Sequence, residues 1–223
     1  MSIFKKIAAR FPRRIQDELK RLHFEKQIKS GHFSTHEPEY KILHQLINPG
    51  DWVVDIGANV GHYTKRLSDL VGSNGRVIAF EPVPSTFALL SANIQLFRHQ
   101  NVTLVNGAVS DDLGIAGMTM PVFDTGLTNY YEARISDHAD YALTVLTIPL
   151  DAFVATRRIA LVKIDVEGHE AFVLRGMKHI IELSHPILIV ETESEEIVRN
   201  LTMLGYTTNR LEQSPNILCK WKV

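Results

Sequence analysis

Two acids and a histidine lie within five residues of one another in the second half of the chain: Asp165, Glu167 and His169. The apolar run 159–164 just before them is typical of a buried strand, so the sequence predicts Asp165 at the tip of that strand. Alternate side chains of extended backbone point the same way, so both carboxylates are expected to face one side. A carboxylate placed there can take a proton from a hydroxyl group, and we predict Asp165, Glu167 and His169 as catalytic residues.

Each of these residues also has a simpler interpretation. Asp165 is equally suited to hold the amino group of a cofactor, and His169 is typical of a solvated residue at a helix start. The neighbouring Glu170 is predicted to be structural, because an acid in the first turn favours the helix dipole. Asp165 and Glu191, which ends the following predicted strand, are candidate ligands for a divalent metal, since hard cations take carboxylate oxygens. We do not expect a metal to be required.

The segment 53–61 reads Val-Val-Asp-Ile-Gly-Ala-Asn-Val-Gly and leads from an apolar strand through a glycine turn into a helix. Gly57 and Gly61 let the backbone approach a ligand closely. A dinucleotide loop has the spacing G-x-G-x-x-G, which cradles pyrophosphate, but Asn59 stands at its second glycine. Asp55, at the strand end, is a poor neighbour for pyrophosphate and a good partner for an ammonium group. These four residues are therefore predicted to bind S-adenosylmethionine, which carries an ammonium group and no phosphate.

The adenosine half of that cofactor has separate candidates. Glu81 ends the next predicted strand, where an acid can accept hydrogen bonds from both ribose hydroxyls. Val83 is placed two residues further on, where it could pack on the adenine face. The turn after the third predicted strand contains Asn106 and Ala108, and its side-chain amide or backbone groups are predicted to bond the adenine edge. A simple strand-ending turn is the alternative for Asn106.

Strands and helices alternate along most of the chain, which predicts an α/β fold with a mostly parallel sheet and helices on both faces. The predicted strands are 52–56, 76–80, 102–105, 159–164, 187–191, 206–210 and 216–222. The predicted helices are 39–47, 62–71, 85–99, 169–183 and 194–204. Residues 107–150 break the rhythm with two strands, 115–122 and 143–149, joined by a polar segment. We predict an insertion at about 112–148, near the active-site edge.

The overall composition excludes several classes of protein. The 223 residues suffice for one such domain, and the single cysteine, Cys219, makes no internal disulfide. Residues 1–30 carry nine Lys or Arg against three acids, a charge of +6, so the remainder carries −7 to reach the net charge of −1. An acidic body argues against a nucleic-acid binder. No membrane span or secretory signal is recognisable, so we expect a cytoplasmic protein.

Residues 1–35 are predicted as a basic helical extension with a break at Pro12. Three roles fit it: a lid packed on the catalytic domain, an element of a homodimer, or a peripheral contact with an anionic membrane. We favour a lid or dimer element, because apolar positions continue past Pro12 through Ile15, Leu19 and Leu22. A purely interfacial anchor does not need that length.

Several short motifs occur in a characteristic order, and the Lys-Ile-Asp-Val-Glu-Gly block at 163–168 is the most specific of them. The others are Pro49–Asp51, Val54–Thr64, Ala79–Pro82, Asn106–Asp111, Pro149–Asp151 and His169–Glu170. Together they resemble the FkbM-type methyltransferases over roughly residues 36–193. The resemblance implies a Rossmann-like class I methyltransferase fold in a catalytic domain over residues 36–223. Such a fold has a seven-stranded sheet and a terminal antiparallel hairpin, whose last strand lies beside the fifth.

The resemblance also implies O-methylation with S-adenosylmethionine, acting on a hydroxyl of a sugar-like or natural-product small molecule. The identity of the acceptor does not carry over, because family members act on varied acceptors. Residues 124–141 are predicted to frame the acceptor pocket, and a solvated loop is the alternative. The polar and aromatic side chains that suit a sugar in that segment are Asn129, Tyr130, Tyr131, Arg134 and His138.

Particular residues disfavour two of three rival functions. An NAD-type oxidoreductase would have glycine in place of Asn59 and no acid at Asp55. A nucleic-acid amino-methyltransferase usually has Asn or Asp, two prolines and an aromatic residue where this chain reads Asp-Val-Glu-Gly at 165–168. A binding module without activity remains an alternative, because intact cofactor residues do not by themselves establish chemistry.

Overall fold

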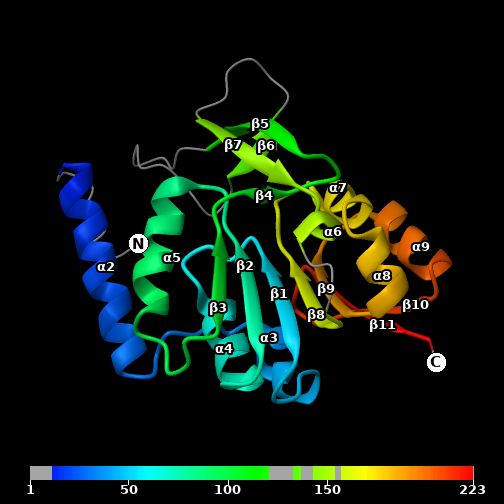
Figure 1. Ribbon diagram of the computed structural model, residues 1–223, viewed down its shortest axis with the longest axis horizontal. Helices are drawn as coiled ribbons and strands as arrows, with labels where there is room; N and C mark the ends of the chain where they lie inside the picture. The colour runs from blue at the N-terminus through cyan, green and yellow to red at the C-terminus, as the bar shows by residue number, and fades with distance from the viewer. Residues whose placement is uncertain (1–11, 121–132, 137–142, 154–156, 223) are drawn as a thin grey trace.

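The computed structural model describes residues 12–120, 133–136, 143–153 and 157–222. Seven strands form a central sheet in the order β10-β11-β9-β8-β1-β2-β3 (Figure 1). Neighbouring strands from β3 to β9 run parallel, while β11 is antiparallel to both β9 and β10. The bounds are β1 Trp52–Ile56, β2 Arg76–Phe80, β3 Val102–Val105, β8 Ile159–Ile164, β9 Ile187–Glu191, β10 Tyr206–Arg210 and β11 Asn216–Trp221. The predicted fold class, including the terminal antiparallel hairpin, is confirmed.

Helices cover both faces of this sheet, because alternate residues of each strand point to opposite sides. One face, which includes Val53 and Leu161, packs on the segment around Leu43 and on the helix containing Leu67. The other face packs on the helices that follow β8 and β9. The first set comprises α3 Pro38–Ile42, η1 Leu43–Gln45, α4 His62–Val71 and α5 Pro84–Ile94. The second comprises α7 Glu170–Arg175, α8 Lys178–Ser184 and α9 Glu195–Met203.

Two helices differ from the prediction: one ends earlier than expected, and the other is divided in two. Helix α5 stops at Ile94 rather than at residue 99, and Phe97 beyond it turns into a buried aromatic cluster. The predicted helix 169–183 is two helices, α7 and α8, because Gly176 packs against Ser110. A Cβ on Gly176 would lie 1.9 Å from the Ser110 carbonyl oxygen. The carboxylate of Asp151, in the short helix α6 (Leu150–Phe153), then accepts from the first free backbone N–H groups of α8.

The residues after β3 form a second sheet in the order β4-β7-β5-β6, which lies above the carboxyl ends of the central strands (Figure 1). Its strands are β4 Ala108–Val109, β5 Gly114–Thr119, β6 Arg134–Ser136 and β7 Leu143–Ile148. The sequence predicted β5 and β7 but missed β4 and β6, which are too short to show a pattern. Of the polar side chains predicted to frame the acceptor pocket, Arg134 is described and exposed. Asn129, Tyr130, Tyr131 and His138 lie outside the described residues.

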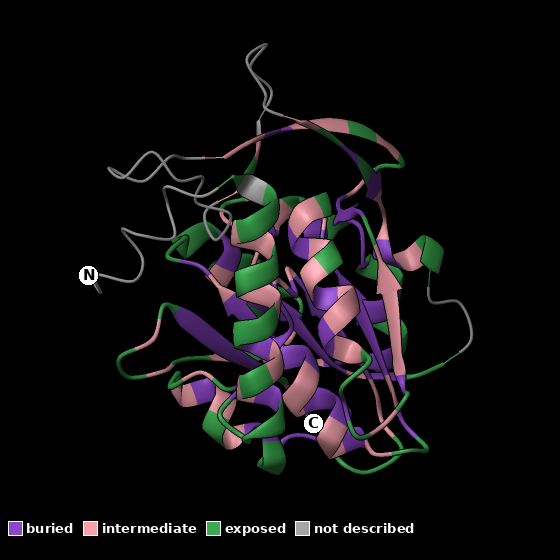
Figure 2. Cartoon of the chain, turned by 90° about the vertical axis from the view of Figure 1, so that its left-hand side faces the viewer, coloured by how far each residue is buried: buried purple, intermediate pink, exposed green. Residues whose placement is uncertain are grey.

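The N-terminal extension contains helix α2, Arg13–Lys29, which starts directly after Pro12 as predicted. Residues 1–11 lie outside the described part of the chain. Helix α2 packs beside α5 and buries Phe24 and Ile28 against Phe33 and the cofactor-loop residue Val60. Ile15, Leu19 and Leu22, which we expected to pack on the domain or on a twin subunit, are 44%, 44% and 49% exposed. Figure 2 shows by colour how buried and exposed residues are distributed over the chain. No helix among the described residues is long and apolar enough to cross a membrane.

Candidate active site

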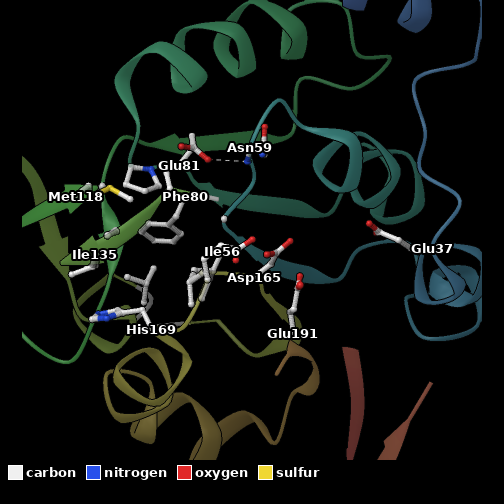
Figure 3. A pocket seen from close by; sticks show the side chains of 18 residues that line it. Glu37, Ile56, Asn59, Phe80, Glu81, Met118, Ile135, Asp165, His169 and Glu191 are labelled. Atoms are coloured by element: carbon white, nitrogen blue, oxygen red, sulfur yellow. Dashed lines mark hydrogen bonds between the residues drawn. The ribbon is translucent and has the colours of Figure 1, made fainter. Parts of the chain in front are cut away.

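The predicted site residues meet at the carboxyl ends of β1, β2, β8 and β9. A cavity of about 250 Å³ lies there beneath the second sheet (Figure 3). Its floor and rim include Gly57, Asn59, Glu81, Ala108, Asp165, Glu167, His169 and Glu191. A second cavity, of about 670 Å³, opens on the side of α4 and is lined by Asp55. The strand register places Asp55 and Lys163 side by side on neighbouring strands.

The loop after β1 approaches the loop after β8 backbone to backbone. Gly57 has a φ of +81°, and a Cβ at this position would lie 1.8 Å from the carbonyl oxygen of Asp165. Asn59 also has a positive φ, and its own side-chain oxygen accepts a hydrogen bond from the N–H of Val60 at 2.8 Å. Gly61, with a φ of +100°, precedes α4 and faces Leu90 closely. Glycine is therefore required at positions 57 and 61 by geometry.

Glu81 is buried at the end of β2 and is held by backbone donors on both sides. Its two carboxylate oxygens accept from the N–H groups of Asn59 at 2.9 Å and of Val83 at 2.8 Å. Burial raises the pKa of Glu81 to about 7, although these hydrogen bonds oppose the shift. Each oxygen keeps a further lone pair for a ligand hydroxyl, because a carboxylate offers about four acceptor positions.

Asp55 is fully buried, and only one of its two carboxylate oxygens has a hydrogen-bond partner. One carboxylate oxygen accepts from the Thr64 hydroxyl at 2.6 Å, while the other has no hydrogen-bond partner. Burial raises the pKa of Asp55, and the Lys163 ammonium opposes this shift. A buried carboxylate oxygen without a donor costs free energy, and an ammonium group of a ligand in the second cavity would supply that donor. This orphaned oxygen fits the amino-acid end of S-adenosylmethionine.

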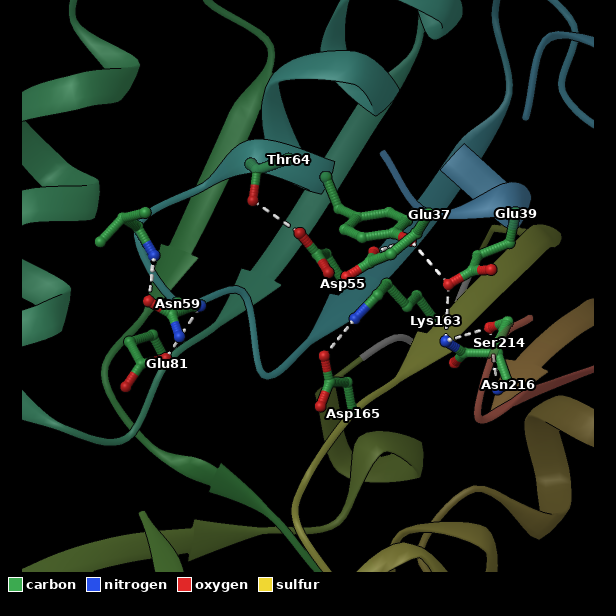
Figure 4. A network of polar contacts seen from close by, with 12 residues as sticks. Glu37, Glu39, Asp55, Asn59, Thr64, Glu81, Lys163, Asp165, Ser214 and Asn216 are labelled. Carbon is green, nitrogen blue, oxygen red and sulfur yellow. Dashed lines mark hydrogen bonds and ion pairs between the residues drawn. The ribbon is translucent and has the colours of Figure 1, made fainter. Parts of the chain in front are cut away.

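Lys163 lines the second cavity and forms an ion pair with Asp165, which lines both cavities. It is 3% exposed, and its Nζ lies 2.7 Å from Asp165 Oδ2 and 4.4 Å from the centre of the Tyr63 ring (Figure 4). Burial alone would raise the pKa of Asp165, but the Lys163 ammonium outweighs it and holds that pKa below its usual range. Burial, followed by the Asp165 charge, raises the pKa of Glu191 to about 8. Asp165 is thus ionised at neutral pH beside a largely protonated Glu191.

The acids Asp165, Glu167 and Glu191 come together more closely than the sequence predicted. One carboxylate oxygen of each lies within 4.8 Å of the others. Glu167 has a φ of +53°, in the left-handed region, so the chain turns here rather than continuing as extended backbone. The metal alternative therefore gains Glu167 as a third candidate ligand besides Asp165 and Glu191. A chelator titration tests it.

His169 caps the start of α7 and lines the first cavity. Its Nε2 lies 2.9 Å from the Ser110 hydroxyl, and its ring stacks on Phe172 at 4.3 Å. These contacts fix the ring, which makes His169 more than a solvated residue at a helix start. Its neighbour Glu170 is buried and accepts from the Gly168 N–H at 2.8 Å. This contact fits the structural role expected for Glu170.

The three adenine candidates take different positions. Ala108 lines the first cavity. Val83 is instead buried in an apolar cluster with Ala108, Met118 and Val145, outside the cavity wall. The amide of Asn106 donates to the carbonyl oxygens of Glu81 and Pro82, at 2.8 and 3.1 Å. Asn106 thus stabilises the turn directly after β2, which carries Glu81. Direct contacts of Val83 and Asn106 with adenine stay predictions.

Sequence reasoning missed several residues of the two cavities. Met118 and Ile135 of the second sheet form part of the wall of the first cavity. Lys163 had a local signal, since a charged residue inside an apolar strand needs a partner. Glu37 and Tyr63, joined by a hydrogen bond of 2.5 Å, carried none, because they lie far apart in the chain.

The sheet order, the antiparallel β11 and the acids at the ends of β1, β2 and β8 define a class I methyltransferase fold. Residues 55–208 match the methyltransferase FkbM domain, and the chain belongs to this family.

Two curated relatives and one solved structure are similar to the chain. The hexuronic acid methyltransferase AglP of Haloferax volcanii is 28% identical over 167 residues, which are 74% of this chain and 65% of that protein. The 31-O-demethyl-FK506 methyltransferase FkbM of Streptomyces tacrolimicus is 32% identical over 162 residues, 59% of this chain and 61% of that protein. The chain thus spans less than two thirds of either relative. The structure of methyltransferase FkbM from Methylobacillus flagellatus KT shares the fold, with a TM-score of 0.54 and 15% identity over 82% of this chain and 50% of that one.

Proposed function

We propose that the chain transfers a methyl group from S-adenosylmethionine to a hydroxyl group of a sugar-like or natural-product small molecule. The observation that carries this proposal is the pair of acids at the two adjoining cavities. Glu81 borders the first cavity with free acceptor positions, and Asp55, one of whose buried oxygens has no hydrogen-bond partner, lines the second. Their separation into two cavities suits a ligand with a ribose at one end and an ammonium group at the other.

S-adenosylmethionine, when bound, supplies an electrophilic methyl group. In this proposal Glu81 holds the ribose, and Asp55 holds the ammonium group. Asp165 lines both cavities and would take the proton of the acceptor hydroxyl as the methyl group passes from sulfur to the hydroxyl oxygen, with the S–CH₃ bond breaking as the O–CH₃ bond forms. Lys163 keeps Asp165 ionised and fixes the orientation of its carboxylate through the 2.7 Å contact.

The acceptor class rests on the printed activities of the relatives and on the wall of the first cavity. One relative is named for a hexuronic acid and the other for a hydroxyl of FK506. The second sheet covers the first cavity with Met118, Ala133 and Ile135, an apolar surface on which a ring can pack. An inactive binding module would keep cofactor affinity without turnover.

Titration calorimetry with S-adenosylmethionine, S-adenosylhomocysteine and NADH tests the cofactor assignment. We expect binding of the first two and none of NADH, because Asp55 and the non-glycine Asn59 leave no place for pyrophosphate. Incubation with methyl-labelled S-adenosylmethionine and a panel of uronic acids and macrolide alcohols then tests transfer. Binding of NADH alone contradicts the proposal, and cofactor binding without transfer to any hydroxyl favours the inactive module.

We propose that the N-terminal extension stabilises the proposed cofactor loop by packing apolar side chains against Val60 and His62. Phe24 and Ile28 pack on Val60, and Phe33 stacks on His62 at 4.2 Å, at the start of α4. Deleting residues 1–30 should therefore lower the free energy of unfolding by at least about 3 kcal/mol, the cost typical of losing one buried Phe, and weaken cofactor binding. Denaturant unfolding and calorimetry measure both effects.

A triple serine variant of Ile15, Leu19 and Leu22 is the matched control, because it changes α2 only on its exposed side. We expect it to bind cofactor normally. Loss of a dimer in this variant favours a homodimer element, and loss of binding to anionic vesicles favours a membrane contact. Unchanged stability and affinity after the deletion contradict the bracing role.

A further inference from the structure

The two cavities of the candidate active site adjoin one another and share four lining residues. These are Glu37, Gly57, Asn59 and Asp165. Two of the four carry a carboxylate, and two are parts of the glycine loop. A ligand that occupies both cavities must pass this junction.

The chemistry of the proposed cofactor decides which of its atoms lies at the junction. Its adenosine carries the ribose hydroxyls that match Glu81 in the first cavity. Its amino-acid end carries the ammonium group that matches Asp55 in the second cavity. The sulfonium links these two halves, so it falls between the cavities and carries a positive charge past their shared carboxylates.

The two shared carboxylates differ in their surroundings. Asp165 forms an ion pair with Lys163 at 2.7 Å, so much of its charge is compensated within the protein. Glu37 instead accepts a hydrogen bond from the neutral Tyr63 hydroxyl, at its Oε2 and 2.5 Å, and it interacts with the Lys163 ammonium only at longer range. No ion pair of Glu37 occurs among the described residues. The junction therefore holds an oriented carboxylate that lines both cavities (Figures 3 and 4 show Glu37 and Asp165).

We propose that Glu37 is a further cofactor-binding residue, whose carboxylate faces the sulfonium. This inference rests on the proposed function. It assigns a binding role to a segment that precedes the matched family domain, which begins at residue 55. Because methyl transfer turns the charged sulfonium into a neutral thioether, Glu37 favours the methyl donor over the demethylated product and eases product release.

Calorimetry with both cofactor forms tests this role. In the Glu37→Gln variant, S-adenosylmethionine should bind about tenfold more weakly at low salt, a loss of about 1.4 kcal/mol, while affinity for S-adenosylhomocysteine changes less than about twofold. Added salt should reduce the difference, since the interaction is between charges near the surface.

Glu39→Gln is the matched control. Glu39 shares the single proton of the Tyr63 hydroxyl with Glu37, at a distance of 3.0 Å, but Glu39 is fully buried and lines neither cavity. Glu39→Gln should leave the ratio of the two dissociation constants unchanged, even if it lowers stability. Tyr63→Phe removes the hydrogen bond that orients the Glu37 carboxylate. It should therefore reduce, but not abolish, the preference for S-adenosylmethionine over S-adenosylhomocysteine.

The outcomes are distinct. Selective weakening of the methyl donor in Glu37→Gln supports the proposal. An equal loss for both cofactor forms overturns it, because the carboxylate would then face the ammonium group that both share. Unchanged affinity for both also overturns it. If the wild-type protein binds neither form, the proposed function itself fails, and this result is visible before any variant is made.

Discussion

The Asp165→Asn variant is expected to turn over its acceptor about 100-fold to 10,000-fold more slowly than the wild type, the range typical of losing a general base. Asparagine has nearly the shape of aspartate but cannot take the proton of a hydroxyl group. The Lys163 ammonium would also lose its charged partner at 2.7 Å. Single-turnover rates with an acceptor from the panel measure the effect, and circular dichroism checks the fold.

Glu191→Gln provides the comparison for Asp165→Asn. The raised pKa of Glu191, about 8, means that this side chain is mostly protonated at neutral pH, and glutamine resembles the protonated form. We therefore expect Glu191→Gln to lower turnover at pH 7 much less than Asp165→Asn does. Glu167→Gln should also lower turnover, with little loss of fold. Full turnover in both Asp165→Asn and Glu167→Gln would show that neither carboxylate acts as the base.

The Glu81→Ala variant is expected to bind S-adenosylmethionine at least about 100-fold more weakly. Two hydrogen bonds from ribose to a carboxylate are lost, each worth on the order of 1.5–3 kcal/mol. The loop is also affected, because the N–H groups of Asn59 and Val83 lose their acceptor. Calorimetry against the conservative Glu182→Gln variant, on the exposed side of α8, measures the loss. An affinity within a factor of two of the wild type contradicts the ribose assignment.

Affinity should also depend on pH through the same carboxylate. With a pKa of about 7, Glu81 is about nine-tenths protonated at pH 6 and about nine-tenths ionised at pH 8. Only the ionised form offers all its acceptor positions to ribose, so affinity should rise by about tenfold from pH 6 to pH 8. Glu81→Gln should remove most of this rise.

The sequence predicted the parts of this protein that depend on local pattern. The apolar runs around Val54 and Val162 predicted the bounds of β1 and β8, because a strand buried on both faces is mostly apolar. The glycine spacing predicted the tight loop after β1 for a similar reason, since positive φ values favour glycine at particular positions.

The remaining features depend on contacts between distant segments. The break between α7 and α8 follows from Ser110 and Asp151, which lie far from it in the chain. The exposed side of α2 could not be told from its buried side, because both carry apolar residues at helical spacing. Glu37 reaches the site through a hydrogen bond to Tyr63, 26 residues away.

The contact between Gly57 and the Asp165 carbonyl has a mechanical consequence. It joins the loop that is proposed to hold the methyl donor to Asp165, the proposed base, through main-chain atoms rather than through side chains. Main-chain atoms of closely packed strands move less than side-chain rotamers do. If these roles hold, the backbone fixes the spacing between donor and base, and differences in acceptor size and shape are accommodated on the opposite side, where the second sheet lines the cavity.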